Sequence, residues 1–255
     1  MTVRSDVPLA GAAVRPEGPE VPLERAADGR TFRGLVGIDL ESATGRRALR
    51  TEVRDICGGL HSVRRELRIS AGRFRIQRLE VDPAFVEPPE SELERIRSEH
   101  EKVARLWEGG ERERRWNRSF RLPLRAPVRD NFGSRRVLNG EKRSPHLGVD
   151  LPASEGTPVV APAPARVVLA EDLYFSGGTV ILDHGAGLFT TYFHLSSIAV
   201  TVGDAMVTGE TIGAVGATGR ATGPHLHWGA RLHSSRINPL ALLRLPRWPT
   251  ASSSD

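Results

Sequence analysis

The chain has 255 residues, of which 39% are hydrophobic and 26% are charged, and its formal net charge is +5. This length allows one large domain or two small ones, and the composition excludes disorder throughout. The positive charge favours an anionic partner such as nucleic acid, a lipid surface or an acidic cell-wall polymer. Because the basic residues are scattered, mild basicity without a special purpose is an equal alternative.

Cysteine content and hydropathy limit the possible compartments. Cys57 is the only cysteine, which excludes an intramolecular disulfide and a cysteine-rich zinc site but leaves the redox compartment open. No apolar run reaches the roughly 20 residues of a membrane-spanning helix. The N-terminal stretch MTVRSDVPLAGAAVRPEG lacks the apolar core of a signal peptide. We therefore expect either a cytosolic protein or one whose signal segment was removed.

The N-terminal third is expected to be β structure. Residues 1–18 are rich in proline, glycine and small side chains, and we expect a flexible lead-in there. Residues 19–86 contain short alternating apolar runs separated by turn formers, which predict a small antiparallel, sandwich-like β domain. We expect its arginines to form solvated strand faces, with a binding surface as the alternative. The runs are TFRGLVGIDL, RALRTEVRDI, SVRRELRIS and GRFRIQRLEV.

A helical period follows in residues 87–116, which we interpret as a connector. Apolar residues recur every three or four positions between residues 91 and 107, with charged residues on the other face. Ser91 and Glu94 have the spacing of a capping box, and two glycines after Glu108 end the pattern. We place the boundary to the next domain between about residues 110 and 120.

Residues 117–245 are again β-like and richer in glycine and proline. Five or more short strands without an intervening helix predict an antiparallel sheet or sandwich. Residues 246–255 are expected to be a frayed tail. The candidate strands are TPVVAPA, ARVVLAED, GTVILDH, LFTTYFHL and ETIGAVGA.

Four histidines and one aspartate in this second half form a candidate metal site. His225 and His227 are two apart, and His146 and Asp150 are four apart, so each pair shares one face of an extended strand. Three such side chains would supply the protein ligands of a catalytic zinc ion, leaving one position for water. Iron is the main alternative, because it also accepts two histidines and one carboxylate. His194 lies between the two pairs in sequence.

Residues 132–239 closely resemble the M23 (lysostaphin/LytM-type) zinc metallopeptidases, which cut peptide cross-links in bacterial peptidoglycan. The preceding GRFRIQRLEVDPAFVEPP and the helix after it are similar to a region found before the peptidase in some bacterial members. The main resemblance follows five segments in order: FGSRRVLNG, SPHLGVDLPASEGTPVVAPAPARVV, GGTVILDHGAGLFTTYFHLS, VGDAMVTGETIGAVGATGRATGPHLHWG and INPL.

The resemblance implies a division of roles within the site. His146, Asp150 and His227 match the zinc ligands, which implies one Zn²⁺ per chain, and His194 and His225 match the residues beside the metal-bound water. In such a site zinc polarises the scissile carbonyl and activates the attacking water, while an imidazole accepts a proton or stabilises the oxyanion. Which of His194 and His225 is the general base remains open.

Other residues of this half have simpler interpretations. The glycines of GAVGATGRATG lack the lysine and Ser/Thr of a phosphate-binding loop, so we expect tight turns that hold the HLH strand in register. His184 is expected in a hairpin turn, outside catalysis. Arg135 and Asn139 lie where the family's groove begins, and we expect them to bind substrate.

The leading functional hypothesis is a zinc-dependent endopeptidase of peptidoglycan stem or bridge peptides. Its partner would be peptidoglycan peptide rather than nucleic acid, which implies a periplasmic, cell-envelope or extracellular location. A non-catalytic relative that binds the cell wall or activates another hydrolase is the alternative. A third possibility is an enzyme whose N-terminal region occupies the groove, which a fragment starting near Arg121 would reveal. The bond that is cut and the oligomeric state stay open.

Overall fold

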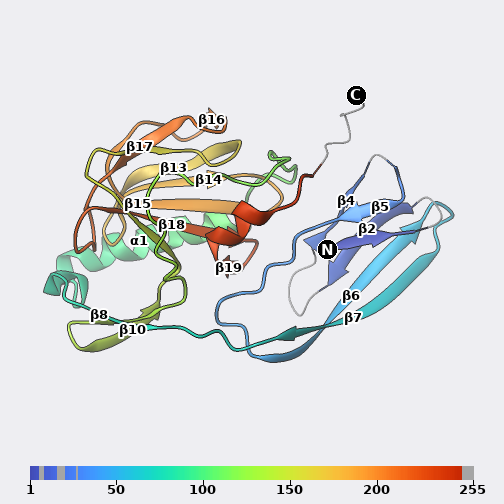
Figure 1. Ribbon diagram of the computed structural model, residues 1–255, viewed down its shortest axis with the longest axis horizontal. Coiled ribbons are helices and arrows are strands. Elements are labelled where there is room, and N and C mark those ends of the chain that lie inside the picture. The colour runs from blue at the N-terminus through green and yellow to red at the C-terminus, as the bar shows by residue number, and fades with distance from the viewer. Residues whose placement is uncertain (6–8, 16–20, 27, 249–255) are drawn as a thin grey trace. The chain divides into compact units, whose positions relative to one another are not determined.

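The computed structural model describes residues 1–5, 9–15, 21–26 and 28–248. The chain forms two compact units, the first made of Met1–Arg73 with the chain end from Trp248, and the second of Phe74–Arg247. Figure 1 shows that strands dominate both units and that one long helix belongs to the second. The predicted fold class, mainly β with a C-terminal antiparallel sheet, is confirmed.

The first unit contains two antiparallel sheets. Their orders are β1-β5-β4 and β3-β2-β6-β7. Side chains from both sheets, including Val14, Phe32 and Val53, enter one buried cluster. This shared core does not by itself establish the predicted sandwich. The strands are β1 (Thr2–Arg4), β2 (Leu9–Arg15), β3 (Val21–Pro22), β4 (Glu24–Arg25), β5 (Thr31–Arg33), β6 (Gly45–Asp55) and β7 (Leu60–Ile69).

The described part of the predicted lead-in is strand rather than flexible chain. Strand β1 pairs with β5, β2 pairs with β6, and Val14 is fully buried. Small residues such as Gly11 and Ala13 weaken the apolar alternation of β2, but strand pairing uses the backbone and does not need bulky side chains. Residues 6–8 and 16–18 of that segment, and most of the predicted tail, lie outside the described residues.

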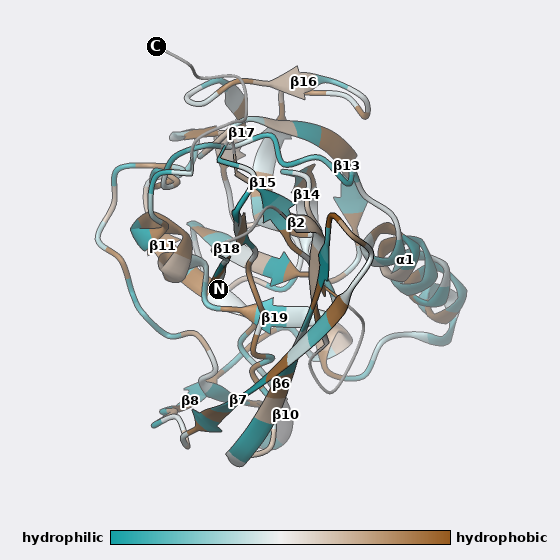
Figure 2. Cartoon of the chain, turned by 90° about the vertical axis from the view of Figure 1, so that its right-hand side faces the viewer, coloured by the Kyte–Doolittle hydropathy of each residue, from teal (hydrophilic) through white to brown (hydrophobic). Residues whose placement is uncertain are grey.

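The predicted helix is α1 (Glu90–Glu108), which ends at Gly109 as expected. Its start differs from the prediction, because Pro89 is the N-cap and makes no side-chain hydrogen bond. Ser91 therefore lies inside the first turn, where it cannot form the capping box. Figure 2 shows a mostly polar helix. Its apolar side packs on a buried cluster of the sheet, formed by Leu169, Leu173, Ile181 and Phe189.

A small sheet precedes the main one in the second unit. It has the order β10-β9-β8, formed by β10 (Glu141–Pro145), β9 (Arg135–Leu138) and β8 (Ile76–Leu79). The sequence placed the β8 segment in the antiparallel N-terminal domain, but β8 pairs in parallel with β9, about 60 residues later in the chain. Alternation identifies a strand without identifying its neighbour, so this pairing was not predictable from the local pattern.

The main sheet has nine strands. Its longest path runs β11-β18-β15-β14-β13-β16, while β17 links β12 to β15 and β19 pairs with β18. Every pairing in it is antiparallel. The strands are β11 (Gly148–Pro152), β12 (Pro158–Val160), β13 (Ala165–Leu173), β14 (Gly177–Asp183), β15 (Leu188–Ile198), β16 (Ala205–Met206), β17 (Thr211–Val215), β18 (His225–Leu232) and β19 (Ser235–Ile237).

The centre of this sheet is covered on both faces. Strand β14 is buried along its whole length, although only residues 180–182 of it form an apolar run. Leu151, Tyr192 and Trp228 are fully buried and hold β11, β15 and β18 in place. Two short 3₁₀ helices complete the unit, η1 (Pro83–Phe85) and η2 (Pro239–Arg244). The strands that carry the site are therefore anchored by fully buried side chains.

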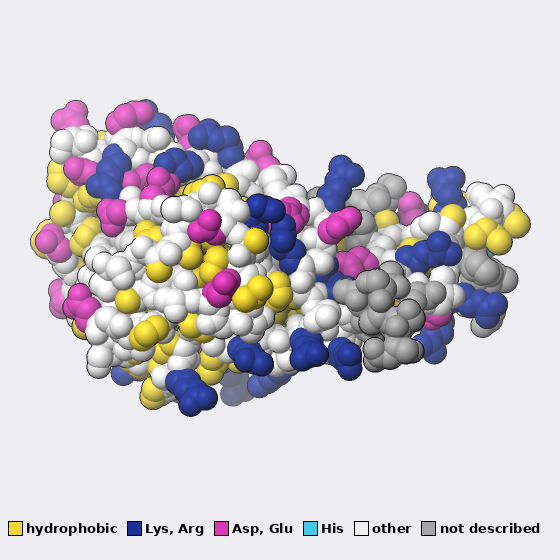
Figure 3. Space-filling view, turned by 90° about the horizontal axis from the view of Figure 1, so that it is seen from above, with side chains coloured by type: hydrophobic (Ala, Val, Ile, Leu, Met, Phe, Trp, Pro, Cys, Tyr) yellow, Lys and Arg dark blue, Asp and Glu magenta, His cyan; other side chains and the backbone are white. Residues whose placement is uncertain are grey.

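Surface charge and helix hydropathy are relevant to the expected partners. Acidic and basic side chains are interspersed on the face shown in Figure 3, as the scattered sequence positions predict. Among the described residues, no helix is both long and apolar enough to span a membrane. The finer division into a β domain, a connector and a peptidase domain stays a prediction, because compactness alone does not define separately folding parts.

Candidate functional site

Three neighbouring strands place the candidate site. In β18, His227 is paired with Asp150 of β11 on one side and with Phe193 of β15 on the other. His225 is paired with Pro152 of β11. Directly paired residues in antiparallel strands project their side chains on the same face. The pairing therefore brings Asp150 and the two histidines of the HLH motif to one side of the sheet.

His146, Asp150 and His227 converge on one point. His146 Nε2 lies 2.7 Å from His227 Nδ1, and Asp150 Oδ1 lies 3.1 Å from the former atom and 3.2 Å from the latter. His146 comes from the turn between β10 and β11 rather than from a strand, and it is 2% exposed. These three atoms form a group that could hold a metal ion.

Backbone contacts fix the chemical form of His146. Its Nδ1 lies 3.1 Å from the carbonyl oxygen of Asn131. A carbonyl only accepts, so Nδ1 carries the proton and Nε2 presents its lone pair to the centre of the group. Burial, the largest influence, lowers the pKa of His146 despite the nearby Asp150 carboxylate. The ring is therefore neutral and available as a ligand at neutral pH.

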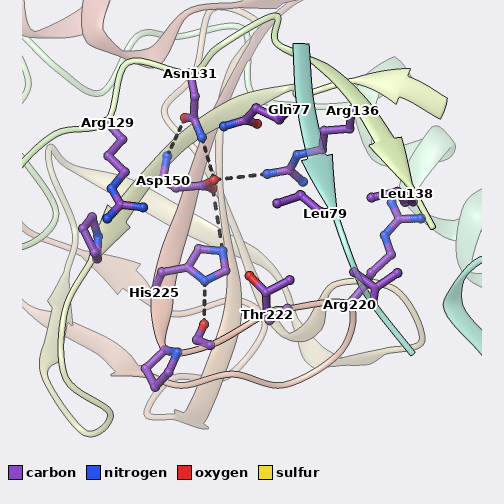
Figure 4. Close-up of a pocket in the computed structure, with 15 residues that line it drawn as sticks. Gln77, Leu79, Arg129, Asn131, Arg136, Leu138, Asp150, Arg220, Thr222 and His225 are labelled. Carbon is purple, nitrogen blue, oxygen red and sulfur yellow. Dashed lines mark hydrogen bonds and ion pairs between the residues drawn. The ribbon is translucent and has the colours of Figure 1, made fainter. Parts of the chain in front are cut away.

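Asp150 is held by two side chains that the sequence did not single out. Its Oδ2 accepts hydrogen bonds from Asn131 Nδ2 at 2.7 Å and from Arg136 Nη2 at 3.1 Å. Figure 4 shows both donors converging on that one oxygen, which leaves Oδ1 directed at the histidines. Burial alone would raise the pKa of Asp150, but its close contacts with His146 and His227 outweigh burial and hold the pKa well below its usual range.

The His227 ring is buried and held by close neighbours. Its ring is stacked on that of Phe193, with centroids 5.0 Å apart and an interplanar angle of 3°, and burial lowers its pKa to about 3. On the other side, a Cβ atom added at Gly148 would lie 2.6 Å from His227 Nε2. Only glycine at position 148 therefore leaves room for the ring as it stands.

His194 and His225 form a second pair beside the first group. Their ring centroids are 4.8 Å apart. Each Nδ1 lies 2.8 Å from a backbone carbonyl, that of Thr218 for His194 and that of Gly223 for His225. Both Nδ1 atoms must donate, so both Nε2 atoms keep a lone pair. His225 Nε2 lies 3.7 Å from Asp150 Oδ1, which directs that lone pair toward the metal-binding group.

A backbone irregularity turns His194 toward the site. His194 has a positive φ of 66°. The register of β15 against β14 shifts between Tyr192 and Leu195, and its register against β17 shifts between Leu195 and Ser197. Phe193 and His194 are adjacent and would point to opposite faces of a regular strand. The β-bulge instead places both rings near His227, with the His194 centroid 6.2 Å away. Burial and then the His225 charge lower the pKa of His194 to about 4.

A cavity of about 320 Å³ opens beside Asp150 and His225, and Arg136 and Leu138 line it. The two predicted substrate-binding residues do not. Arg135 is exposed and alternates with Arg136 along β9, and the Asn139 side chain bonds both backbone groups of Val81 at 2.9 Å. Neither residue therefore lines this cavity, and their role in substrate binding stays a prediction.

The remaining sequence interpretations concern residues outside the site. His184 follows β14 in the turn before β15 and is fully buried. Its Nδ1 donates to the Pro164 carbonyl at 2.9 Å, and its Nε2 lies 2.8 Å from Thr190 Oγ1. The glycine-rich segment before β18 forms turns, with Gly219 at a φ of 64°, and leads into a strand rather than a helix.

The donor set fits a zinc ion. Two neutral imidazoles and one carboxylate are ordinary zinc ligands, and two ligand atoms of a tetrahedral zinc lie about 3.4 Å apart. The separations of 2.7 to 3.2 Å among the three atoms are close to that value. The fixed tautomer of His146 and the two donors on Asp150 Oδ2 are the kind of outer contacts that orient metal ligands.

Comparison with known proteins agrees with this geometry. The family model for peptidase family M23 matches residues 144–239. The chain contains an M23 peptidase domain. A crystal structure assigned to peptidase M23 from Pseudomonas aeruginosa is similar well beyond that domain. It has 29% sequence identity and a TM-score of 0.71, covering 95% of this chain and 91% of the other.

Curated relatives of the M23 domain differ in their described roles. The peptidoglycan DD-endopeptidase ShyA of Vibrio cholerae is 37% identical over 114 residues, which cover 44% of this chain and 26% of ShyA. The murein hydrolase activator EnvC of Escherichia coli is 36% identical over 117 residues, which cover 46% of this chain and 27% of EnvC. The chain thus aligns with only about a quarter of the length of these relatives.

Proposed function

We propose that the protein is a zinc-dependent endopeptidase that hydrolyses stem or bridge peptides of bacterial peptidoglycan. One observation carries this proposal: three ligand atoms converge within 3.2 Å, and beside them lie two further histidines whose Nδ1 atoms are held by backbone carbonyls, so that each Nε2 keeps a lone pair. Relatives described as peptidoglycan DD-endopeptidases support the substrate class. Because peptidoglycan lies in the cell envelope, this substrate implies a periplasmic, envelope or extracellular location.

In this proposal His146, Asp150 and His227 hold the zinc ion. When bound, zinc lowers the pKa of its water and polarises the scissile carbonyl. Asn131 and Arg136 keep Asp150 in one orientation by occupying its second oxygen. Phe193 excludes water from one face of His227. Two strands and the segment just before β11 thus hold all three ligands in place before an ion binds, which favours binding.

His194 and His225 are the proposed proton-handling pair. Each ring is locked by a backbone carbonyl with its Nε2 available, so either can accept the proton that the nucleophile loses and hold it for the leaving amine. A protonated ring beside the scissile bond also stabilises developing negative charge. Because the rings lie 4.8 Å apart, both can contact one substrate.

The test uses purified peptidoglycan sacculi and soluble muropeptide release. The zinc-loaded full chain should clear the suspension, and a chelator or the substitutions Asp150→Ala and His227→Ala should stop release. Arg125→Gln, on an exposed residue outside the cavity beside Asp150, is the matched control and should retain activity. If both ligand variants still released muropeptides at the wild-type level after zinc removal, the proposal of a zinc-dependent endopeptidase would be wrong.

A second candidate function is a non-catalytic module that binds the cell wall or activates another hydrolase. The likeness to EnvC, described as an activator, supports it. The five site residues oppose it, because a module without catalysis has no need of two histidines with directed lone pairs. Elemental analysis separates the candidates: one zinc per chain supports the enzyme, and a purified chain that takes up no zinc supports the binding module.

A further inference from the structure

The cavity beside Asp150 has an excess of positive charge. Three arginines line it, Arg129, Arg136 and Arg220, together with one carboxylate, that of Asp150. Arg136 is paired with Asp150 at 3.1 Å, so these two charges compensate each other. The guanidinium group of Arg129 remains, and in Figure 4 Arg129 and Arg220 lie on opposite sides of the Asp150–His225 pair.

Arg129 stands directly beside the site. Its backbone nitrogen donates to the Asp150 carbonyl at 3.2 Å, and the two residues form an antiparallel bridge. Side chains of such a pair project on the same face. The Asp150 carboxylate nevertheless takes its hydrogen bonds from Asn131 and Arg136. Within the described residues, no hydrogen bond or ion pair involves the Arg129 guanidinium, which is exposed at the cavity.

Arg220 is less free to move than Arg129. Its guanidinium lies over the Phe175 ring at 4.9 Å and its Nη1 is 3.5 Å from the Phe85 carbonyl. Such a half-buried, stacked guanidinium keeps its charge at a fixed place. Arg220 therefore adds a constant positive potential to the cavity, while Arg129 can adjust to a ligand.

A buried hydrogen-bond acceptor lies in the wall of this cavity. Gln77 of β8 lines it, and the side-chain Oε1 of Gln77 is buried without a hydrogen-bond partner among the described residues. An unsatisfied buried carbonyl costs free energy unless a ligand donates to it. The N–H of a peptide bond would satisfy it. The lining thus combines a site for a negative charge with a site for a peptide donor.

We propose that this cavity is a substrate subsite for a carboxylate-bearing peptide and that Arg129 pairs with the carboxylate. The inference rests on the proposed peptidase function and names its substrate class: acidic stem peptides rather than uncharged glycine bridges. A carboxylate gains a charge-assisted, bidentate hydrogen bond from a guanidinium. A glycine chain gains no such bond, so the cavity discriminates between the two.

The test compares one stem tripeptide with free carboxylates and the same tripeptide with those carboxylates amidated. Titration calorimetry with the zinc-loaded full chain measures both dissociation constants, and no bond needs to be cut. We expect the free carboxylate form to bind about tenfold more tightly, the range of one hydrogen bond to a charged group. The preference should decrease as salt is added, because the pair is partly exposed.

Three substitutions test which residue causes the preference for the free-carboxylate tripeptide. Arg129→Gln should bind both tripeptides equally, whereas Arg125→Gln, outside the cavity, should keep the tenfold ratio. Gln77→Leu should weaken both tripeptides by the same factor, because it removes an acceptor and no charge. The inference is overturned if the wild-type chain binds the two tripeptides within twofold of each other or if Arg129→Gln retains the ratio.

The binding test of the subsite and the activity test of the endopeptidase can fail independently. If the chain binds the acidic tripeptide preferentially but releases nothing from sacculi, the subsite stands and the endopeptidase does not. If it digests sacculi but ignores amidation, the endopeptidase stands and the subsite does not. In an active enzyme, Arg129→Gln should raise KM for an acidic substrate with little change in kcat, because Arg129 contacts no reacting atom.

Discussion

The Phe193 ring lies parallel to the imidazole of His227, with 5.0 Å between their centroids and 3° between their planes. The two residues are also direct partners in the β15–β18 pairing. The stack prevents the imidazole from rotating about its χ2 bond, and this keeps Nδ1 directed at Asp150 and His146. An aromatic residue of the sheet therefore orients a proposed metal ligand.

Loss of this stack should weaken metal binding. Phe193→Ala frees the His227 ring and opens one face to water, so we expect zinc affinity to fall by about 10- to 100-fold, as for other outer partners of metal ligands. Competition with a chromophoric chelator measures it. Phe193→Tyr keeps the aromatic ring and should retain affinity within a few fold, whereas equal losses in both variants would contradict the stacking role.

The two histidines of the HLH motif should separate metal binding from catalysis. His227→Ala removes one of three ligand atoms, and zinc should be lost during dialysis. His225→Ala leaves all three ligand atoms in place, so it should retain zinc while the rate of peptide hydrolysis falls by about 10²- to 10⁴-fold. Elemental analysis and muropeptide release check the two results. Loss of zinc from His225→Ala would reverse the assigned roles.

Arg136 and Arg135 make a matched pair on neighbouring positions of β9. Arg136 donates to Asp150 Oδ2 at 3.1 Å, whereas Arg135 is exposed. Arg136→Met should lower zinc affinity by about tenfold because Asp150 loses one of its two orienting donors. Arg135→Met should leave affinity unchanged. A similar loss in both variants would mean that charge near the site, rather than the contact, controls affinity.

Stability should decrease in acid partly through His184. Burial lowers the pKa of His184 from 6.5 to about 4, so the folded chain keeps the ring neutral where the unfolded chain protonates it. The contribution of His184 to stability is complete above pH 6.5 and is lost as the pH falls toward 4. The difference is on the order of 3 kcal/mol.

Denaturant unfolding of zinc-free protein between pH 7 and pH 4 measures this effect. His184→Gln removes the titrating ring, so its free energy of unfolding should decline less steeply with falling pH than that of the wild type. His100→Gln, at an exposed position on α1, controls for the loss of a histidine. If the free energy of unfolding changed with pH in the same way for wild type and His184→Gln, protonation of His184 would not destabilise the folded chain, and the prediction would be wrong.

Regular strands explain what the sequence could predict. The two-residue period of HLH places His225 and His227 on one face, and the observed strand β18 has that geometry. Asp150 was predicted beside them from the resemblance and from spacing, and the β11–β18 pairing brings it opposite His227. The period of a strand is local information, and the common face of His225 and His227 depends on it alone.

Other parts of the site depend on contacts that periodicity does not encode. The positive φ of His194 and the bulge around it were not visible in LFTTYFHL, and family resemblance rather than spacing indicated that residue. Arg136 and Asn131 contact Asp150 from segments before the matched domain. Each depends on how distant segments meet, as does the parallel pairing of β8 with β9.

That parallel pairing limits how the chain can be divided. A fragment starting near Arg121 lacks β8, and so it loses Gln77 from the cavity wall and leaves an edge of β9 unpaired. It also lacks α1, which covers the apolar cluster of Leu169 and Phe189. Exposed edges and apolar clusters promote aggregation. A fragment that keeps both contacts therefore begins near Phe74, well upstream of residues 144–239, which match the family model.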